Sequence, residues 1–354
     1  MHDLHSWGFG PYYELQLSDD WVPARVAAAH KDAYVVWSAA GENFARLSGR
    51  LIRESQDESY PGVGDWVTLR TLPQEGETST IERLLDRRTV FTRGAAGQQT
   101  RGQVIAANVD IVFVVSGLDD DYNIRRIERY LARIWASGAR PMVILNKADV
   151  CDDLVARIAE VQSISPGLDV IATSAKRGEG LDSIVRYLGP GITGAFVGSS
   201  GAGKSTLVNS LLGEERFATS EVRADDSRGR HTTTHRQLVL LPSGGLLVDT
   251  PGMRELALYD EEGLDMVFTD IEALAARCRF ADCSHRGEPG CAVLDAVDRG
   301  EIPLERLDHY LKLQAEARSY ETRQDEHRRR KGERAFSKRI GSDLKLIRKW
   351  KEGR

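Results

Sequence analysis

Short runs of alternating or β-branched residues, separated by polar turns, fill the chain from about residue 25 to residue 85. This pattern predicts β-strands, because successive side chains of a strand point to opposite faces and turns collect Gly, Pro and Asp. Strands are expected over residues 25–29, 34–38, 43–51, 65–72 and 78–85. Five short strands so close together are typical of a small closed barrel such as the oligonucleotide/oligosaccharide-binding fold, the OB-fold. Residues 1–20 show no clear period and are interpreted as an arm.

Aromatic residues punctuate the expected barrel. An OB-fold often presents a groove to RNA or single-stranded DNA, and aromatic side chains there can stack on bases. The candidates are Tyr34, Trp37, Phe44 and Trp66. Since small barrels fill their interiors with such side chains, we expect most of these four to lie in the core.

From residue 104 onward, apolar strand-length runs alternate with runs of helical spacing. Strands are expected over residues 109–115, 141–145, 169–172, 192–197, 237–241 and 246–248, and helices over 124–137, 154–164 and 205–212. The alternation predicts a mostly parallel sheet with helices on both faces. Residues 89–103, glycine-rich and basic without an apolar period, are interpreted as a linker.

A glycine-rich stretch, GSSGAGKS from Gly198 to Ser205, lies between an expected strand and an expected helix. That context, with a glycine, four residues and then Gly-Lys-Ser, predicts a phosphate-binding loop rather than a chance glycine-rich turn. Its backbone N–H groups would face phosphate oxygens, Lys204 would reach the β- and γ-phosphates, and Ser205 would place its hydroxyl on Mg²⁺. The candidate phosphate-binding residues are Gly198, Ser199, Ser200, Gly201, Ala202, Gly203, Lys204, Ser205 and Thr206.

Two further motifs follow neighbouring expected strands, where ligand loops belong in an α/β sheet. They are Asn146-Lys147-Ala148-Asp149 and Ser174-Ala175-Lys176. The Asp149 carboxylate can accept two hydrogen bonds from the ring N–H and the exocyclic amine of guanine, a donor pair that adenine does not present, so it selects GTP. Asn146 would brace the loop, the stem of Lys147 would lie over the purine, and the Ala175 N–H would point at the guanine oxygen.

The segment 213–236 is polar and has no period, and it predicts a mobile loop that nucleotide would order. One of Thr233 and Thr234, with Thr234 favoured, would close on Mg²⁺ and the γ-phosphate. Asp249 would hold Mg²⁺ through water, and the Gly252 N–H would sense the γ-phosphate.

These motifs resemble those of the TRAFAC class of GTPases in an unusual order, since NKAD and SAK precede the phosphate loop. The order indicates a circular permutation, which makes the nucleotide-sensing loop after Gly252 the last part of the domain. Met253 stands where Ras-like GTPases carry a water-orienting glutamine, and a thioether cannot orient water. Either a partner supplies that group, or His231 or His235 does, unless both are simply exposed loop residues. Candidate catalytic residues are therefore His231, Thr234 and Lys204.

Composition indicates the class of protein and shows that charge is distributed unevenly along the chain. The chain has 354 residues, 41% hydrophobic and 29% charged, no apolar run of membrane-spanning length, and an N-terminus unlike a secretory signal; we expect a cytoplasmic protein and no membrane partner. The net charge of −5 hides a tail, residues 318–354, of about +8. A basic tail on an acidic body favours a polyanionic partner, although a solvated helix is the plainer reading of a charge run.

Three cysteines and a histidine crowd one short polar segment as C-x₄-C-x-H-x₅-C. They are Cys278, Cys283, His285 and Cys291. Three thiolates and one imidazole form a closed tetrahedral set typical of structural zinc, whereas cysteines buried as small hydrophobes would have less polar neighbours. Helices are expected over residues 294–300 and 304–324.

The barrel, the permuted motif order and the segments RGRHTTTHR, DTPGMREL and CRFADCSHRGEPGCAV together resemble the ribosome small-subunit-dependent GTPase A family, RsgA. The resemblance implies hydrolysis of GTP to GDP and phosphate, stimulated by the small ribosomal subunit and its rRNA, and a role in late maturation of that subunit. A permuted GTPase acting on the large subunit or another structured RNA stays open. A metabolite kinase is disfavoured by NKAD, SAK and the threonine loop.

We expect a multidomain protein, and because no motif in the sequence demands an oligomer, we expect a monomer. It comprises an arm (1–20), an OB-fold barrel (21–88), a linker (89–103), a circularly permuted α/β P-loop GTPase domain (104–265), a zinc-binding helical domain (266–317) and a basic tail (318–354).

Overall fold

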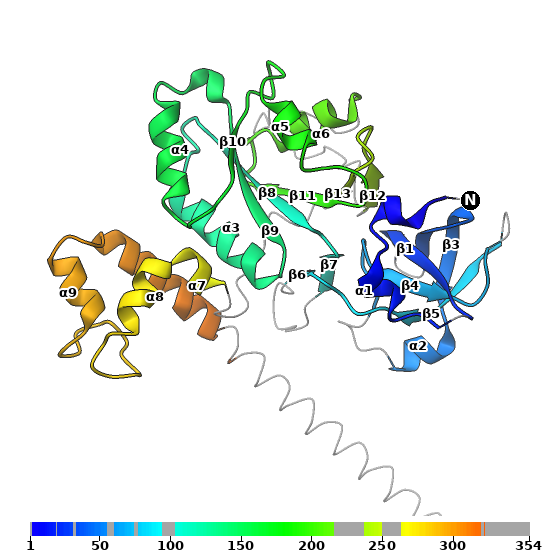
Figure 1. Ribbon diagram of the computed structural model, residues 1–354, viewed down its shortest axis with the longest axis horizontal. Coiled ribbons are helices and arrows are strands. Elements are labelled where there is room, and N and C mark those ends of the chain that lie inside the picture. Colours follow the sequence, from blue (N-terminus) through cyan, green and yellow to red (C-terminus); the bar gives the residue numbers. More distant parts are fainter. Residues whose placement is uncertain are drawn as a thin grey trace, which may run out of the picture.

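The computed structural model describes residues 2–18, 20–30, 33–54, 60–73, 77–93, 103–215, 237–249, 263–319 and 322. Figure 1 shows a β-barrel in blue, an α/β unit in cyan to green beside it, and a group of yellow and orange helices on the opposite flank. No helix within these ranges is both long and apolar enough to cross a bilayer.

Five strands close the N-terminal barrel. They are β1 (Val22–Ala29), β2 (Tyr34–Ser38), β3 (Gly41–Leu47), β4 (Trp66–Leu69) and β5 (Ser79–Leu84). Strands pair in the order β1-β2-β3-β5-β4, and β4 returns to pair with β1, which confirms the expected OB-fold barrel. The third strand ends at Leu47, earlier than expected, because Ser48 starts helix α2 (Gly49–Glu54) by accepting a hydrogen bond from the Leu51 N–H at 3.1 Å.

The barrel interior is lined by alternating apolar residues of these strands, among them Val26, Val36, Val67 and Ile81. Tyr34 and Trp66 are buried, as expected for core aromatics, whereas the Phe44 side chain is 62% exposed. Of the aromatic candidates for base stacking, only Phe44 is thus largely exposed.

The N-terminal arm is part of the packed structure. It forms a 3₁₀ turn, η1 (Leu4–Trp7), and one helical turn, α1 (Pro11–Glu14). Trp7, Phe9 and Tyr13 are buried in one cluster with Trp66 of the barrel and Leu246 of the α/β sheet. The arm therefore fills the junction between the barrel and the sheet.

The α/β unit is built on six strands. They are β8 (Ile111–Gly117), β9 (Arg140–Asn146), β10 (Val170–Ala172), β11 (Thr193–Gly198), β12 (Gln237–Leu240) and β13 (Leu246–Asp249). Their order is β10-β9-β8-β11-β13-β12, and all adjacent pairs are parallel except β12 with β13. The predicted, mostly parallel sheet is confirmed.

Helices cover both faces of this sheet. They are α3 (Ile124–Ala136), α4 (Leu154–Gln162), α5 (Leu181–Val185) and α6 (Lys204–Leu212). Alternate residues of β8 separate the two layers: Val112 and Val114 belong to the core of α3 and α4, and Phe113 and Val115 to the core of α5 and α6. Burial on both faces explains why these strands are continuously apolar rather than alternating.

A hairpin occupies both ends of the segment interpreted as a linker. Strands β6 (Val90–Arg93) and β7 (Gln103–Ala107) pair antiparallel, so the linker interpretation is wrong for these residues. The apolar residues that form the hairpin, Phe91 among them, are few and far apart in the sequence, and glycines and arginines between them mask their period. Within the described residues, one backbone β-bridge, Ala28 to Gln237, joins the barrel to the α/β sheet through β1 and β12.

The C-terminal helices form a unit that contacts α3 through its first and last helices. They are α7 (Leu264–Val267), α8 (Thr269–Ala275), α9 (Ala292–Asp298) and a helix over residues 304–319. The buried Glu128 of α3 accepts a hydrogen bond from Arg306 at 2.7 Å and lies 2.6 Å from His309 Nδ1. Arg129, one residue further along α3, makes a two-pronged ion pair with Glu316 at 2.9 and 3.0 Å. Charged contacts thus fix the helical unit to the α/β unit.

Candidate nucleotide and metal sites

The phosphate loop connects β11 to α6, as its sequence predicts. Gly198 has φ 143°, and a Cβ there would lie 2.1 Å from the Val115 carbonyl oxygen. Gly203 has φ 95°, and a Cβ there would lie 2.2 Å from Asn146 Nδ2. Only glycine fits at either position, so the loop backbone lies tightly on the ends of β8 and β9 and opens onto the N-terminus of the nine-residue helix α6. This is a fitting cradle for phosphate oxygens.

Lys204 folds back along its own loop. Its Nζ donates to the Gly198 carbonyl at 2.8 Å and to the Ser199 carbonyl. Ser205 and Thr206 follow in the first turn of α6 and are partly exposed, whereas Ser200 and Gly201 are exposed and Ala202 is buried. The ammonium group therefore lies at the phosphate loop, where it would have to be to contact the β- and γ-phosphates.

Asn146 joins three loops. Its side chain, 2% exposed, donates from Nδ2 to the Ala202 carbonyl at 2.8 Å, which ties the end of β9 to the phosphate loop. Its Oδ1 accepts from the Ala175 N–H at 3.0 Å and from Thr173 Oγ1 at 3.1 Å. These contacts fit the expected bracing role of Asn146. Thr173 was not predicted, because a threonine at a strand end carries no signal by itself.

Asp149 lies in the 3₁₀ turn η3 (Ala148–Val150) that follows β9. Its Oδ1 accepts a hydrogen bond from Ser174 Oγ at 2.7 Å, and its Oδ2 lies 3.5 Å from Arg177 Nε. The Ser174 hydrogen bond, helped by the charges of Arg177 and Lys176, holds the pKa of Asp149 below its ordinary value. The group is therefore an ionised acceptor at neutral pH, as guanine recognition requires.

Lys147, the second residue of the NKAD motif, has a left-handed backbone with φ 62°. Its Nζ pairs with Asp119, a residue of the loop after β8 that sequence reasoning did not single out. The structure thus gathers Asn146, Lys147, Asp149, Ser174, Ala175 and the phosphate loop at the carboxyl ends of β8, β9, β10 and β11. Lys176 follows Ala175 and is exposed. Their individual roles stay predictions.

The remaining candidates are described only in part. Asp249 is the last residue of β13. His231, Thr234, Gly252 and the neighbouring His235 and Met253 lie outside the described residues, as do residues 323–354 of the tail.

The four expected metal ligands form a compact cluster. One donor atom from each of Cys278, Cys283, His285 and Cys291 lies within 4.8 Å of all the others. In tetrahedral zinc sites sulfurs are about 3.8 Å apart and a sulfur and a nitrogen about 3.6 Å. Here the Sγ atoms of Cys278 and Cys291 are 3.9 Å apart, and His285 Nδ1 is 3.7 and 3.4 Å from them. The donor set and spacing are compatible with one zinc ion.

The local backbone brings these donors together. Cys291 caps α9 by accepting from the Leu294 N–H at 3.4 Å, and His285 adopts a left-handed conformation with φ 56°. Glu288 holds the intervening loop by accepting from the Ser284 and Arg286 N–H groups at 3.0 and 2.9 Å.

The fold and the nucleotide-site motifs together define a circularly permuted P-loop GTPase, in which the base-recognition strands β9 and β10 precede the phosphate-loop strand β11. The family model described as "RsgA GTPase" matches residues 84–259. A curated relative from Opitutus terrae, "Small ribosomal subunit biogenesis GTPase RsgA", is 47% identical over 89% of this chain and 87% of its own. One from Lactiplantibacillus plantarum, "Small ribosomal subunit biogenesis GTPase RsgA 2", is 45% identical over 86% and 85%. The chain belongs to the RsgA family of GTPases.

Solved structures agree with this assignment. The crystal structure of YjeQ from Thermotoga maritima superimposes with a TM-score of 0.63 at 26% identity, over 84% of this chain and 98% of that one. That of YloQ, described as a circularly permuted GTPase, gives 0.62 at 25% identity, over 85% and 96%. The expected permutation is confirmed.

Proposed function

We propose that this protein is a GTPase that binds the small ribosomal subunit, acts in its late maturation and hydrolyses GTP to GDP and phosphate with stimulation by the subunit. The observation that carries the proposal is the near-full-length identity of 45–47% to relatives named for small-subunit biogenesis. The nucleotide site, with its cradle between Gly198 and Lys204 and its ionised Asp149, is the chemistry such an activity needs.

In this proposal the described residues divide into a base end and a phosphate end. Asp149 and the Ala175 N–H read guanine, while Asn146 holds both to the phosphate loop. The loop N–H groups and Lys204 neutralise the β- and γ-phosphates. Mg²⁺, held by Ser205, Thr234 and Asp249, would add electrostatic stabilisation of the transferred phosphoryl group.

The group that orients the attacking water is narrowed to a few candidates, because the residue at the usual position is a methionine. Because Met253 has no hydrogen-bonding group suited to this task, we infer that His231, His235 or the subunit itself provides it. Slow turnover by the isolated protein is the expected consequence.

The Cys₃His cluster is proposed to hold one structural zinc ion, since all four tetrahedral positions are filled by protein donors. The helical unit around it, the barrel and the basic tail would contact rRNA. We propose that the protein acts as a monomer in the cytoplasm, where ribosomes assemble.

The test is GTP turnover by the purified protein alone and with separated small or large subunits at matched low salt. Strong stimulation by the small subunit alone is expected. Stimulation by the large subunit alone would favour the alternative partner, and an unchanged rate with either would refute the ribosomal role. Asp149→Asn serves as the specificity control: it should lose GTP turnover and gain turnover of xanthosine triphosphate, whose 2-carbonyl accepts from the Asn amide.

A further inference from the structure

The loop between β8 and α3 carries three consecutive aspartates, of which two contact the nucleotide site. Asp119 pairs with Lys147 of the base-recognition motif. Asp121 accepts a hydrogen bond from Ser199 of the phosphate loop. Asp120, between them, is exposed. A single loop thus contacts the base end and the phosphate end of the site, although neither motif includes it.

At the base end, the geometry depends on a glycine. A Cβ at Gly117 would lie 2.6 Å from Asp119 Oδ1 and 3.5 Å from Lys147 Cδ. The missing side chain leaves room for the Asp119 carboxylate at the point where it meets the Lys147 Nζ. Fixing the amine at one end restricts the stem, which is the part expected to cover the purine.

At the phosphate end, Asp121 is itself held. Arg126, in the first turn of α3, donates to both oxygens of Asp121 at 2.8 and 3.0 Å. Ser199 receives two restraints, since its hydroxyl donates to Asp121 and its carbonyl accepts from Lys204. The carboxylate therefore fixes the same loop residue that contacts the phosphate-binding lysine.

We propose that Asp119 and Asp121 are positioning residues for guanine nucleotide, which set the Lys147 stem and the Ser199 segment of the phosphate loop, respectively. The proposal rests on the proposed nucleotide site and deepens it. Because both carboxylates come from one short loop, they also fix the distance between the base end and the phosphate end. Preformed spacing of this kind lowers the entropic cost of binding.

The test is a pair of double-mutant cycles, read as the dissociation constant of a fluorescent N-methylanthraniloyl-GDP with Mg²⁺ on the full-length protein. Asp119→Asn should weaken binding about threefold and Asp121→Asn about fivefold, modest values because both side chains are partly exposed. The effect of Asp119→Asn should vanish in a Lys147→Met background. Likewise, the effect of Asp121→Asn should vanish in a Ser199→Ala background.

Controls separate positioning from general loss of structure. Asp120→Asn removes the same charge from the same loop and should bind like wild type. Asp121→Asn should keep most of its effect in the Lys147→Met background, because Asp121 hydrogen-bonds Ser199 and Arg126, whereas Lys147 pairs with Asp119. All variants should keep a melting temperature within about 2 °C of wild type without nucleotide.

Wild-type affinity from either single variant, or an undiminished effect of each in its partner's background, would overturn the proposal. Equal losses from Asp120→Asn would also overturn it, since loop charge alone would then act. Failure of wild type itself to bind the probe would instead refute the nucleotide site on which the proposal rests.

Discussion

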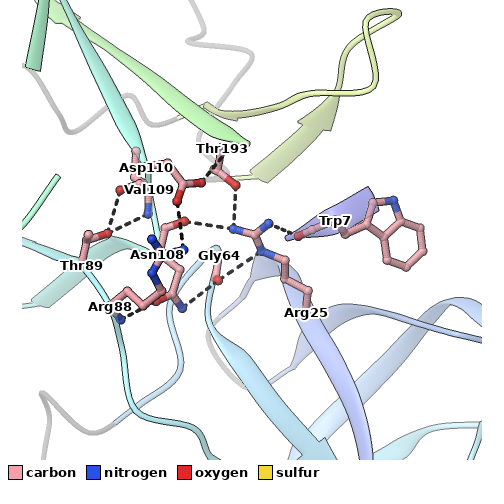
Figure 2. A network of polar contacts seen from close by, with 9 residues as sticks. All are labelled: Trp7, Arg25, Gly64, Arg88, Thr89, Asn108, Val109, Asp110 and Thr193. Atoms are coloured by element: carbon pink, nitrogen blue, oxygen red, sulfur yellow. Dashed lines mark hydrogen bonds and ion pairs between the residues drawn. The ribbon is translucent and has the colours of Figure 1, made fainter. Parts of the chain in front are cut away.

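Replacing Arg25 by methionine should loosen the barrel from the α/β sheet. The guanidinium is 1% exposed and lies where the arm, the barrel and the sheet meet (Figure 2). It donates to Thr193 Oγ1 at 2.8 Å, to the Asn108 carbonyl at 3.1 Å, to the Gly64 carbonyl at 3.3 Å and to the Trp7 carbonyl. One side chain therefore satisfies acceptors from four separate segments.

The magnitude follows from what the substitution leaves behind. Burial lowers the pKa of Arg25 to about 10, so the cation has a desolvation cost that its hydrogen bonds must offset. Methionine removes that cost but leaves four buried acceptors with fewer donors, each worth about 1 kcal/mol or more. We expect a loss of about 4 kcal/mol, the sum for four such neutral acceptors. This is a large fraction of the stability of an ordinary domain.

Urea unfolding followed by tryptophan emission suits this test, because Trp7 and Trp66 lie in the arm cluster and Arg25 lies 5.5 Å from the Trp66 ring. With a slope of about 2–3 kcal/mol per molar urea, the midpoint should fall by roughly 1.5–2 M. Arg25→Lys is the matched control: one ammonium cannot reach acceptors spread around a planar fork, so about half the loss should remain.

An unchanged midpoint in Arg25→Met would refute the reasoning. A lysine variant as stable as wild type would show that positive charge near Asp110, rather than the fork of hydrogen bonds, holds the junction.

Three other outcomes are expected. Burial raises the pKa of Asp270, but hydrogen bonds and the charge of Arg306 more than offset this effect and hold the pKa below its ordinary value. The stability that the ionised carboxylate contributes is therefore present above about pH 4 and is lost as the pH falls further. Asp270→Asn should accordingly flatten the acid side of the plot of melting temperature against pH. Gly198→Ala should weaken GDP binding more than about tenfold, because the new Cβ meets the Val115 carbonyl at 2.1 Å. Gly189→Ala is the matched control and should bind GDP normally, since the backbone there is not left-handed and a Cβ meets nothing within 4 Å. A zinc chelator should lower the melting temperature of wild type, with a released metal measurable by a colorimetric indicator, and should not affect a variant lacking the Cys₃His ligands.

Local patterns were sufficient where one residue class dominates a segment. The strands of the α/β sheet are apolar on both faces, and the helices α3 and α6 carry caps or glycine ends, so their positions follow from the sequence within a few residues. The hairpin β6–β7 was not predicted, because its two strands are separated by a glycine-rich stretch and pair only across it. The burial of the N-terminal arm was not predicted for a related reason: Trp7 and Tyr13 are buried by residues distant in the chain, and no local sequence period indicates that.

The residues of the candidate site likewise fall into two groups, those predicted from a local motif and those brought to the site by the fold. The glycines, Lys204 and Asp149 were found because their chemistry fixes both residue type and spacing, whatever the surrounding fold. Asp119 and Asp121 meet Lys147 and Ser199 only because parallel strands β8, β9 and β11 end at one edge of the sheet. Three aspartates after a strand have no such spacing rule, since exposed acidic residues are common in loops. Long-range partners of a motif are therefore set by topology, and in this protein they include the two carboxylates that we propose position the base end and the phosphate end of the nucleotide site.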